Sequence, residues 1–245
     1  MRRVVIALIV LIAACAPSSR TGDPQPQSQA SSRVGVTASV TALGDSVPFG
    51  TACNCTPYPT LSFGAVHVSD DAMPGATSGD VLRQVDDHDD TIADVRDSDA
   101  VMVEIGANDV SYTSGCGTDA SCYATAVPQI GTNVRAIVDR VHALTTGHPV
   151  EIVLLDYWNV WLGGQYAHAQ GPAYLAAADD VTTLVNNAIR SVARDTSSIY
   201  VNVRAAFRGA DDDRDETSLL APDGDHPNAA GHRRIADAVA AAVRR

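Results

Sequence analysis

The sequence predicts an α/β protein in which a five-stranded parallel sheet lies between two layers of helices, a three-layer α/β/α sandwich. Two observations carry this prediction. Short apolar, β-branched runs alternate with longer segments whose apolar residues recur at helical spacing. The central runs are also almost continuously apolar, which is typical of parallel strands that are buried on both faces.

Five segments are expected to form the strands of this sheet. The first, residues 34–43, is rich in valine, threonine and alanine and ends at Gly44. The others cover residues 65–68, 100–105, 150–155 and 199–203. Because ligands bind beyond the carboxyl ends of parallel strands, we expect a functional site in the segments that follow them.

Helical spacing marks the covering layers. Residues 130–144 repeat isoleucine, valine and leucine at intervals of three and four, and this helix is expected to end at Gly147. Residues 181–192 and 235–243 show the same pattern. A shorter helix around Val81 and Val85 is expected to begin with Ser78 as its cap. No internal repeat is visible, so residues 34–245 are expected to form one domain.

The first 33 residues differ in composition from this domain. Two arginines precede an apolar run that is too short to span a bilayer, as in an export signal. The segment ending at Cys15 resembles the lipobox of bacterial lipoproteins, which implies a signal peptide over residues 1–14 and a lipid on Cys15. Residues 15–33 would then be the anchor and a flexible tether, and the protein would lie outside the cytoplasmic membrane. The alternatives are an ordinary secretory signal or a single membrane helix.

Charge and cysteine content narrow the class of protein further. The formal net charge is −12 and no stripe of basic residues is present, so nucleic acid is not an expected partner. Four cysteines besides Cys15 in an exported chain indicate disulfides, and their spacing does not match a zinc site. Three pairings are open, with the local one slightly favoured; the cysteines are Cys53, Cys55, Cys116 and Cys122.

Three short motifs carry groups that acyl transfer requires. Gly44-Asp45-Ser46 follows the first expected strand and places a hydroxyl on a tight turn. Gly106-Ala107-Asn108-Asp109 follows the third strand, and Asp223-Gly224-Asp225-His226 precedes the last helix. A hydroxyl, an imidazole that takes its proton and a carboxylate that orients the imidazole form a nucleophilic triad.

The ordered set of these motifs, together with Gly75, resembles the SGNH hydrolases, also called GDSL-type esterases and lipases, from about residue 34 to the C-terminus. The resemblance implies a flavodoxin-like fold, with Ser46 as nucleophile, His226 as general base and Asp223 as the acid that orients it. It also implies an oxyanion hole formed by the backbone N–H groups of Ser46 and Gly75 and the amide of Asn108. Gly79 and Asp225 are the alternatives for the second oxyanion-hole donor and the orienting acid, and Asp45 is expected to bond to nearby backbone.

An aromatic segment follows the fourth expected strand. Tyr157, Trp158, Trp161 and Tyr166 are candidates to line an acyl or sugar pocket, or they pack a long loop over the sheet. We therefore expect a monomeric serine esterase without metal or cofactor, acting on an acyl lipid, a small acyl ester or an O-acetyl glycan. The alternative is a non-enzymatic surface lipoprotein that binds a lipid or glycan with the same fold.

Overall fold

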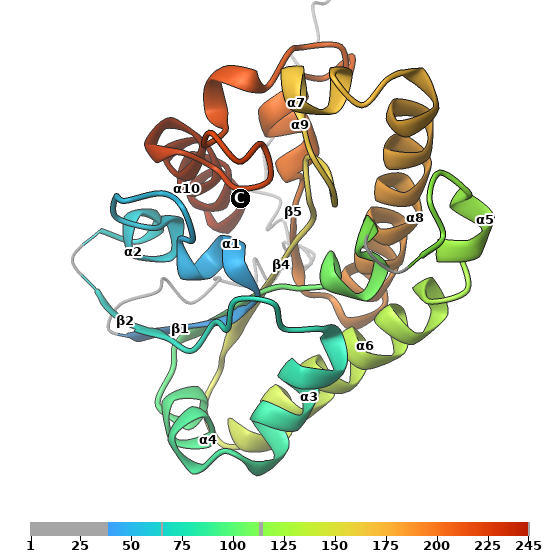
Figure 1. Ribbon diagram of the computed structural model, residues 1–245. Helices are drawn as coiled ribbons and strands as arrows, with labels where there is room; N and C mark the ends of the chain where they lie inside the picture. Colours follow the sequence, from blue (N-terminus) through green and yellow to red (C-terminus); the bar gives the residue numbers. More distant parts are fainter. Residues whose placement is uncertain (1–38, 65, 113–114, 245) are drawn as a thin grey trace, which may run out of the picture. The chain divides into compact units, whose positions relative to one another are not determined.

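The computed structural model describes residues 39–64, 66–112 and 115–244. Its centre is a sheet of five parallel strands in the order β2-β1-β3-β4-β5 (Figure 1). The strands are β1 (Ser39–Gly44), β2 (His67–Asp70), β3 (Ala100–Glu104), β4 (Glu151–Leu155) and β5 (Ile199–Val201).

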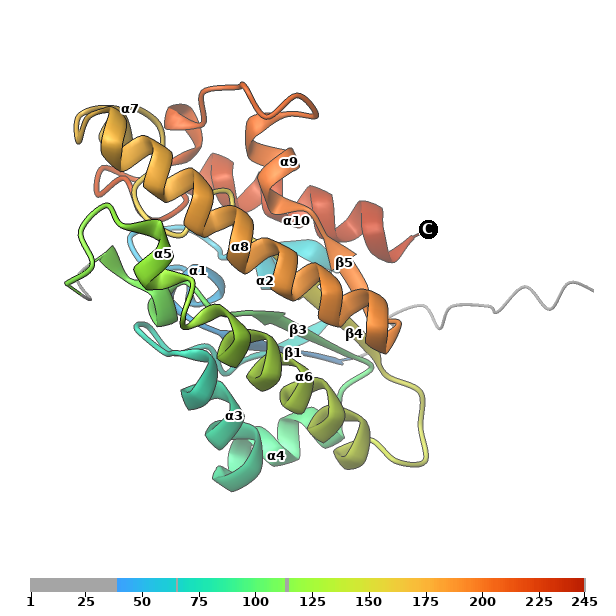
Figure 2. The same ribbon diagram turned by 90° about the vertical axis from the view of Figure 1, so that its right-hand side faces the viewer.

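Helices cover both faces of this sheet. In Figures 1 and 2, α3, α4, α6 and α8 lie on one face, and α10, flanked by α2 and α9, lies on the other. This arrangement confirms the predicted α/β/α sandwich. The helical elements are α1 (Ser46–Phe49), α2 (Tyr58–Ser62), α3 (Ser78–Asp87), α4 (Asp89–Arg96), η1 (Asn108–Val110), α5 (Ala120–Tyr123), α6 (Val127–Leu144), α7 (Gly164–His168), α8 (Pro172–Thr196), α9 (Val203–Arg208), η3 (Thr217–Leu219) and α10 (Ala229–Val243).

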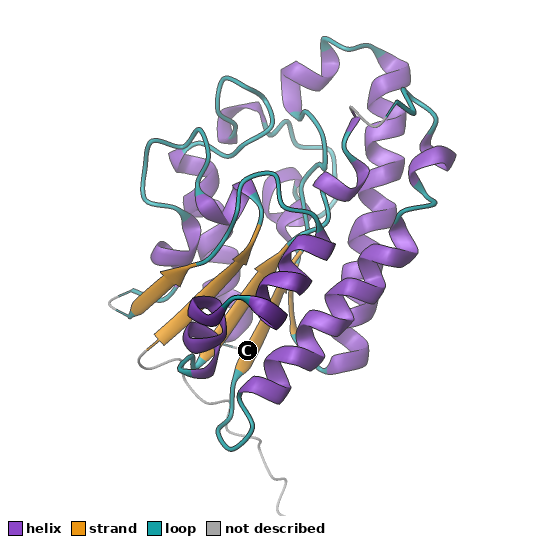
Figure 3. Cartoon of the chain, turned by 60° about the horizontal axis from the view of Figure 1, so that its bottom comes forward, coloured by secondary structure: helices purple, strands orange, loops and turns teal. Residues whose placement is uncertain are grey.

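The core is formed where the apolar helix faces meet the central strands. Every residue of β3 is buried, as its continuous apolar sequence predicts for a strand between two helical layers. On α6 the apolar positions with helical spacing are almost completely buried: Ile130, Val134, Ile137, Val138 and Val141. Figure 3 shows that the strands run in the same direction, so their carboxyl ends share one edge of the sheet.

Two strands differ from their predicted bounds. β2 covers residues 67–70 instead of 65–68, because its pairing with β1 begins at Ser39 opposite His67. β5 ends at Val201 instead of Val203, since the side chain of Asn202 accepts the N–H of Ala205 and begins α9 there. Residues 34–38 of the first predicted strand lie outside the described residues.

Helix boundaries differ for similarly local reasons. Thr77, not Ser78, caps α3, through a reciprocal capping box with Asp80. The predicted end of α6 at Gly147 was wrong, because the helix already ends at Leu144. The helix α4 was not predicted; it begins in an acidic, exposed segment at Asp89, which suits the positive end of a helix.

The expected signal peptide, the lipid-bearing Cys15 and the tether lie outside the described residues. Within the residues that are described, no helix combines the length and the apolar character that a bilayer span requires.

Candidate active site

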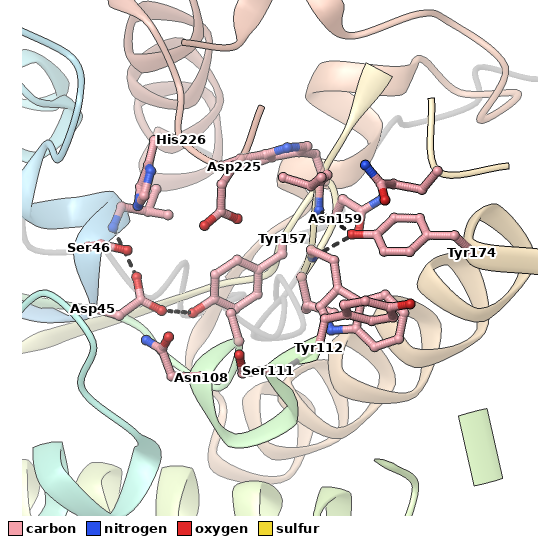
Figure 4. Close-up of a pocket in the computed structure, with 17 residues that line it drawn as sticks. Asp45, Ser46, Asn108, Ser111, Tyr112, Tyr157, Asn159, Tyr174, Asp225 and His226 are labelled. Carbon is pink, nitrogen blue, oxygen red and sulfur yellow. Dashed lines mark hydrogen bonds between the residues drawn. The ribbon is translucent and has the colours of Figure 1, made fainter. Parts of the chain in front are cut away.

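Loops that leave the carboxyl ends of β1, β3 and β4 surround a pocket of about 290 Å³. The turn that carries Asp225 and His226 also contributes to its lining (Figure 4). This is the edge at which the parallel topology predicts a ligand site. The fold therefore brings the motifs at Ser46, Asn108 and His226 to one pocket, although they are far apart in the sequence.

The turn that presents Ser46 depends on a glycine. Gly44 has a φ of +150°, and a Cβ on it would lie 2.2 Å from the backbone oxygen of Glu104. Only glycine fits this close approach of two neighbouring strands. Ser46 follows as the first residue of α1, capped by the side chain of Asp45, which accepts the N–H of Val47 at 3.0 Å.

Asp45 has a second partner that the sequence did not indicate. The hydroxyl of Tyr157 donates a hydrogen bond of 2.5 Å to Asp45 Oδ2, and the acid is only 1% exposed. Burial raises the pKa of Asp45 to about 6, although the hydrogen bonds from Tyr157 and Val47 oppose this shift. The expected bond to nearby backbone is present, but the turn is also tied to the segment after β4.

Asp223 and His226 form a direct pair. The Nδ1 atom of His226 lies 2.8 Å from Asp223 Oδ2, and Asp223 Oδ1 accepts the backbone N–H groups of Asp225 and His226, each at 3.1 Å. Partial burial raises the pKa of Asp223, but the bonds from His226 and Asp225 outweigh it and the net pKa is lowered. Of the two candidate orienting acids, the structure thus pairs Asp223 with the imidazole.

Ser46 and His226 line the same end of the pocket, as Figure 4 shows. Among the described residues no direct hydrogen bond joins their side chains. Such a bond is often long in an enzyme without substrate and tightens when the substrate binds.

Of the residues predicted to form the oxyanion hole together with Ser46, Asn108 lines the pocket, whereas Gly75 and its alternative Gly79 do not. Asn108 lines the pocket, and its side-chain amide donates a 2.9 Å bond to the backbone oxygen of Ala76, which leaves its second N–H for a ligand. Gly75 lies in the adjoining turn with a φ of +81°, but it is not part of the pocket lining. Gly79 lies within α3 and is not part of the lining either.

Asp109, the residue after Asn108, anchors the start of α3, which follows the turn that contains Gly75. Its carboxylate accepts the backbone N–H of Ser78 at 2.8 Å and the Ser78 hydroxyl at 2.6 Å. Burial raises the pKa of Asp109, while these bonds lower it. The sequence motif therefore combines a pocket-lining amide with a carboxylate that anchors the first residue of α3.

Three of the four predicted aromatic residues line the pocket: Tyr157, Trp158 and Trp161. They are at most 4% exposed, so they also pack the loop over the sheet. Tyr166 is not part of the lining. Sequence reasoning missed Tyr112, which is 39% exposed and contacts Trp161 with ring centroids 4.9 Å apart. It also missed Tyr174 on α8, for which no strand-end signal exists in the sequence.

A second buried acid lies behind the Ser46 turn. Glu104, the last residue of β3, is 0% exposed, and neither carboxyl oxygen has a hydrogen-bond partner within the described part of the chain. Burial, followed by repulsion from Asp45, raises the pKa of Glu104 well above its usual value.

The cysteines pair locally. The structure contains the disulfides Cys53–Cys55 and Cys116–Cys122, the closest of the three possible pairings in sequence. Cys53, Cys55 and His232 offer atoms within 4.8 Å of one another, the only such group of possible metal ligands among the described residues. The sulfurs are bonded to each other, and His232 Nδ1 already accepts the N–H of Tyr58, so this group has no thiolate for a metal.

Solved structures share this fold. The lipase Lip_vut3 from a goat rumen metagenome is 16% identical; the match covers 84% of this chain and 97% of the lipase, with a TM-score of 0.68. A catalytic mutant of Axe2, an acetylxylan esterase from Geobacillus stearothermophilus, is 19% identical; the match covers 86% of this chain and 96% of the esterase, with a TM-score of 0.63. Among curated proteins no match is found.

The match to a protein family is more specific than these structural likenesses. Residues 42–234 match the GDSL-like Lipase/Acylhydrolase family, and this range contains the pocket-lining motifs at Ser46, Asn108 and His226. It confirms the resemblance to GDSL-type hydrolases that the motifs indicated. The chain therefore belongs to the GDSL-like Lipase/Acylhydrolase family and is a carboxylic ester hydrolase.

Proposed function

We propose that the chain is a serine esterase in which Ser46 is the nucleophile, His226 the general base and Asp223 the acid that orients His226. The observation that carries this proposal is the pocket itself. Ser46 and His226 lie 180 positions apart in the sequence, yet both line one cavity. Asp223 Oδ2 lies 2.8 Å from Nδ1 of the imidazole. This leaves Nε2 to take a proton on the side of the substrate.

The reaction follows in two acyl-transfer steps. Ser46 Oγ attacks the ester carbonyl carbon while its proton passes to His226, and the carbonyl electrons move to the oxygen. The carbon–oxygen bond to the alcohol then breaks, and His226 returns the proton to that leaving oxygen. Water attacks the acyl-serine and gives a proton to His226; the acid leaves as Ser46 Oγ takes the proton back.

Negative charge on the carbonyl oxygen needs fixed donors. We assign these to the backbone N–H of Ser46, the amide of Asn108 and the backbone N–H of Gly75. Asn108 is the better supported of the last two, because it lines the pocket and its orientation is set by Ala76. A well-placed donor lowers the barrier by about 3–4 kcal/mol.

Replacement of the proposed nucleophile tests this assignment. Ser46→Ala and His226→Ala should each abolish hydrolysis of phenyl acetate, and Asn108→Ala should retain a residual rate about 10²–10³-fold lower. Ser191→Ala, on α8 outside the pocket, is the matched serine control. Normal turnover by Ser46→Ala would exclude the triad.

The same variants distinguish an enzyme from a lipid- or glycan-binding lipoprotein. A fluorophosphonate should label the wild-type protein covalently at Ser46, as mass spectrometry of the labelled peptide can show. Folded wild-type protein that takes up no label would favour the binding protein.

The size of the pocket favours a short acyl group. A cavity of about 290 Å³ lies at the lower limit of ordinary ligand sites, so a small acyl ester or an O-acetyl glycan fits better than a long acyl lipid. Hydrolysis of esters with increasing acyl length should fall steeply beyond a few carbons.

We also propose that the enzyme acts outside the cytoplasmic membrane, held by lipid on Cys15. The basis is the sequence alone: a basic start, a short apolar run and the residues that precede this cysteine. Expressed from its full gene, the wild-type protein should sediment with membranes, and Cys15→Ser should release it or leave it unprocessed. Mature protein without lipid on Cys15 would contradict the anchor.

A further inference from the structure

One acid in the pocket has no role in the proposed reaction. Asp225 lines the cavity beside His226, and Figure 4 shows its carboxylate in the space between Ser46 and Tyr157. The pairing of Asp223 with His226 leaves Asp225 out of the triad. Within the described residues, no hydrogen bond or ion pair to the Asp225 carboxylate is found. The group is therefore exposed to whatever enters the pocket.

The charge of the lining is one-sided. Its charged groups are the carboxylates of Asp45 and Asp225, and His226 is the only basic side chain among the lining residues. No arginine lines the pocket, and the chain contains no lysine. Asp45 lies behind the turn and is bonded to Tyr157, so Asp225 is the acid that a substrate meets. An anion in this space would face the like charge of Asp225 with no lysine or arginine in the lining to offset it.

Other residues of the pocket lining carry groups that can form hydrogen bonds with hydroxyls. Asn159 accepts the N–H of Trp161 at 3.0 Å with its side-chain oxygen, which leaves its amide N–H groups for a ligand. Gln170 adds a second neutral amide to the lining, which also contains Tyr112, a residue that is 39% exposed. A free carboxylate accepts hydroxyl hydrogen bonds strongly, and amides can donate or accept.

We propose that Asp225 is a specificity-determining residue that selects uncharged, hydroxyl-bearing esters, such as acetylated neutral sugars, and excludes anionic ones. This inference rests on the esterase function proposed above. Burial, the largest effect, raises the pKa of Asp225 above its usual value, although the nearby imidazole of His226 lowers it. Its ionised form is therefore best tested at pH 8.

Two substrates that differ by one charge provide the test: an acetylated methyl glucoside and the matching acetylated methyl glucuronoside. Acetate release by the wild-type enzyme at pH 8 should show a kcat/KM about tenfold higher for the glucoside. Asp225→Asn, which keeps the shape of the side chain, should reduce this ratio to about twofold. Asp225→Ser should reduce it similarly, since it also removes the charge.

The control is Asp211→Asn, which removes the same charge from an exposed position outside the pocket and should leave the ratio as in the wild type. Either of two results would overturn the proposal: a ratio that Asp225→Asn leaves unchanged, or equal slowing of both substrates, which would mean that Asp225 acts through His226. Failure of the esterase function itself would look different. The wild-type protein would then release acetate from neither sugar and take up no fluorophosphonate.

Discussion

The side chain of Asp45 bonds across the fold to Tyr157, whereas the side-chain bonds of Asp223 all stay within three positions of the chain. Asp45 is buried at the end of a central strand and bonded to the segment after β4. Asp223 is exposed on a surface loop and bonds to the imidazole and backbone just after it.

Because of this contrast, we expect substitutions at the buried turn to change the stability of the fold, and substitutions at the exposed turn to change the rate of hydrolysis. A change at the buried turn disturbs β1, β3 and the loop after β4 together, because all three meet there. Replacement of the Asp223 side chain removes only bonds to the imidazole and to the two backbone N–H groups just after it. Three substitutions test this separation.

The largest effect is expected from Asp223→Asn. The amide cannot balance a positive imidazole and favours the wrong tautomer, so kcat should fall about 10³–10⁴-fold. The melting temperature should change little, because the acid lies on an exposed turn. Kinetics on phenyl acetate and thermal unfolding measure the two effects. A large drop in melting temperature would show that the exposed turn also supports the fold.

The next effect is expected from Gly44→Ala, and it should appear in stability. The new Cβ would collide with the Glu104 backbone oxygen, so we expect a loss of about 3–4 kcal/mol in the free energy of unfolding. Gly117→Ala is the matched control: its φ is also positive, at +57°, but nothing lies within 4 Å of the added carbon. Its cost should be about 1–2 kcal/mol. Equal losses in urea unfolding would contradict the proposed clash.

The smallest effect is expected from Tyr157→Phe, which removes a donor from buried Asp45. The folded pKa of Asp45, about 6, already lies above the usual 3.8, so the folded state holds a proton that the unfolded state releases and stability falls as pH rises through this window. Without the Tyr157 bond the pKa rises further, so the variant should lose about 1–3 kcal/mol at pH 8 and less at pH 4.

The control for this variant is Tyr166→Phe, which removes a hydroxyl from a partly buried tyrosine that does not contact Asp45. Its unfolding free energy should show no comparable pH dependence. A loss in Tyr157→Phe that is the same at pH 4 and pH 8 would mean that the Asp45 charge is not what the tyrosine stabilises.

Much of this architecture could be predicted from local pattern. The apolar run at residues 100–105 and the helical spacing at residues 130–144 indicate burial on their own, because period and polarity are properties of short segments. The predicted ends of helices and strands were less accurate than the predicted elements themselves, because a single capping side chain can set an end. Asn202 ends β5 and Thr77 begins α3, and either residue is compatible with several local structures.

By itself, the sequence determined the layered α/β class, the order of the motifs and the residue types that acyl transfer needs. Only the tertiary structure decided which side chains come together. Tyr157 bonds to Asp45 and Ser78 bonds to Asp109, whereas the Asp225 carboxylate lines the cavity without a bonding partner in the described part of the chain. The physical reason is that secondary structure follows from neighbours in the chain, whereas a pocket is made by strands and loops that come together only when the core packs.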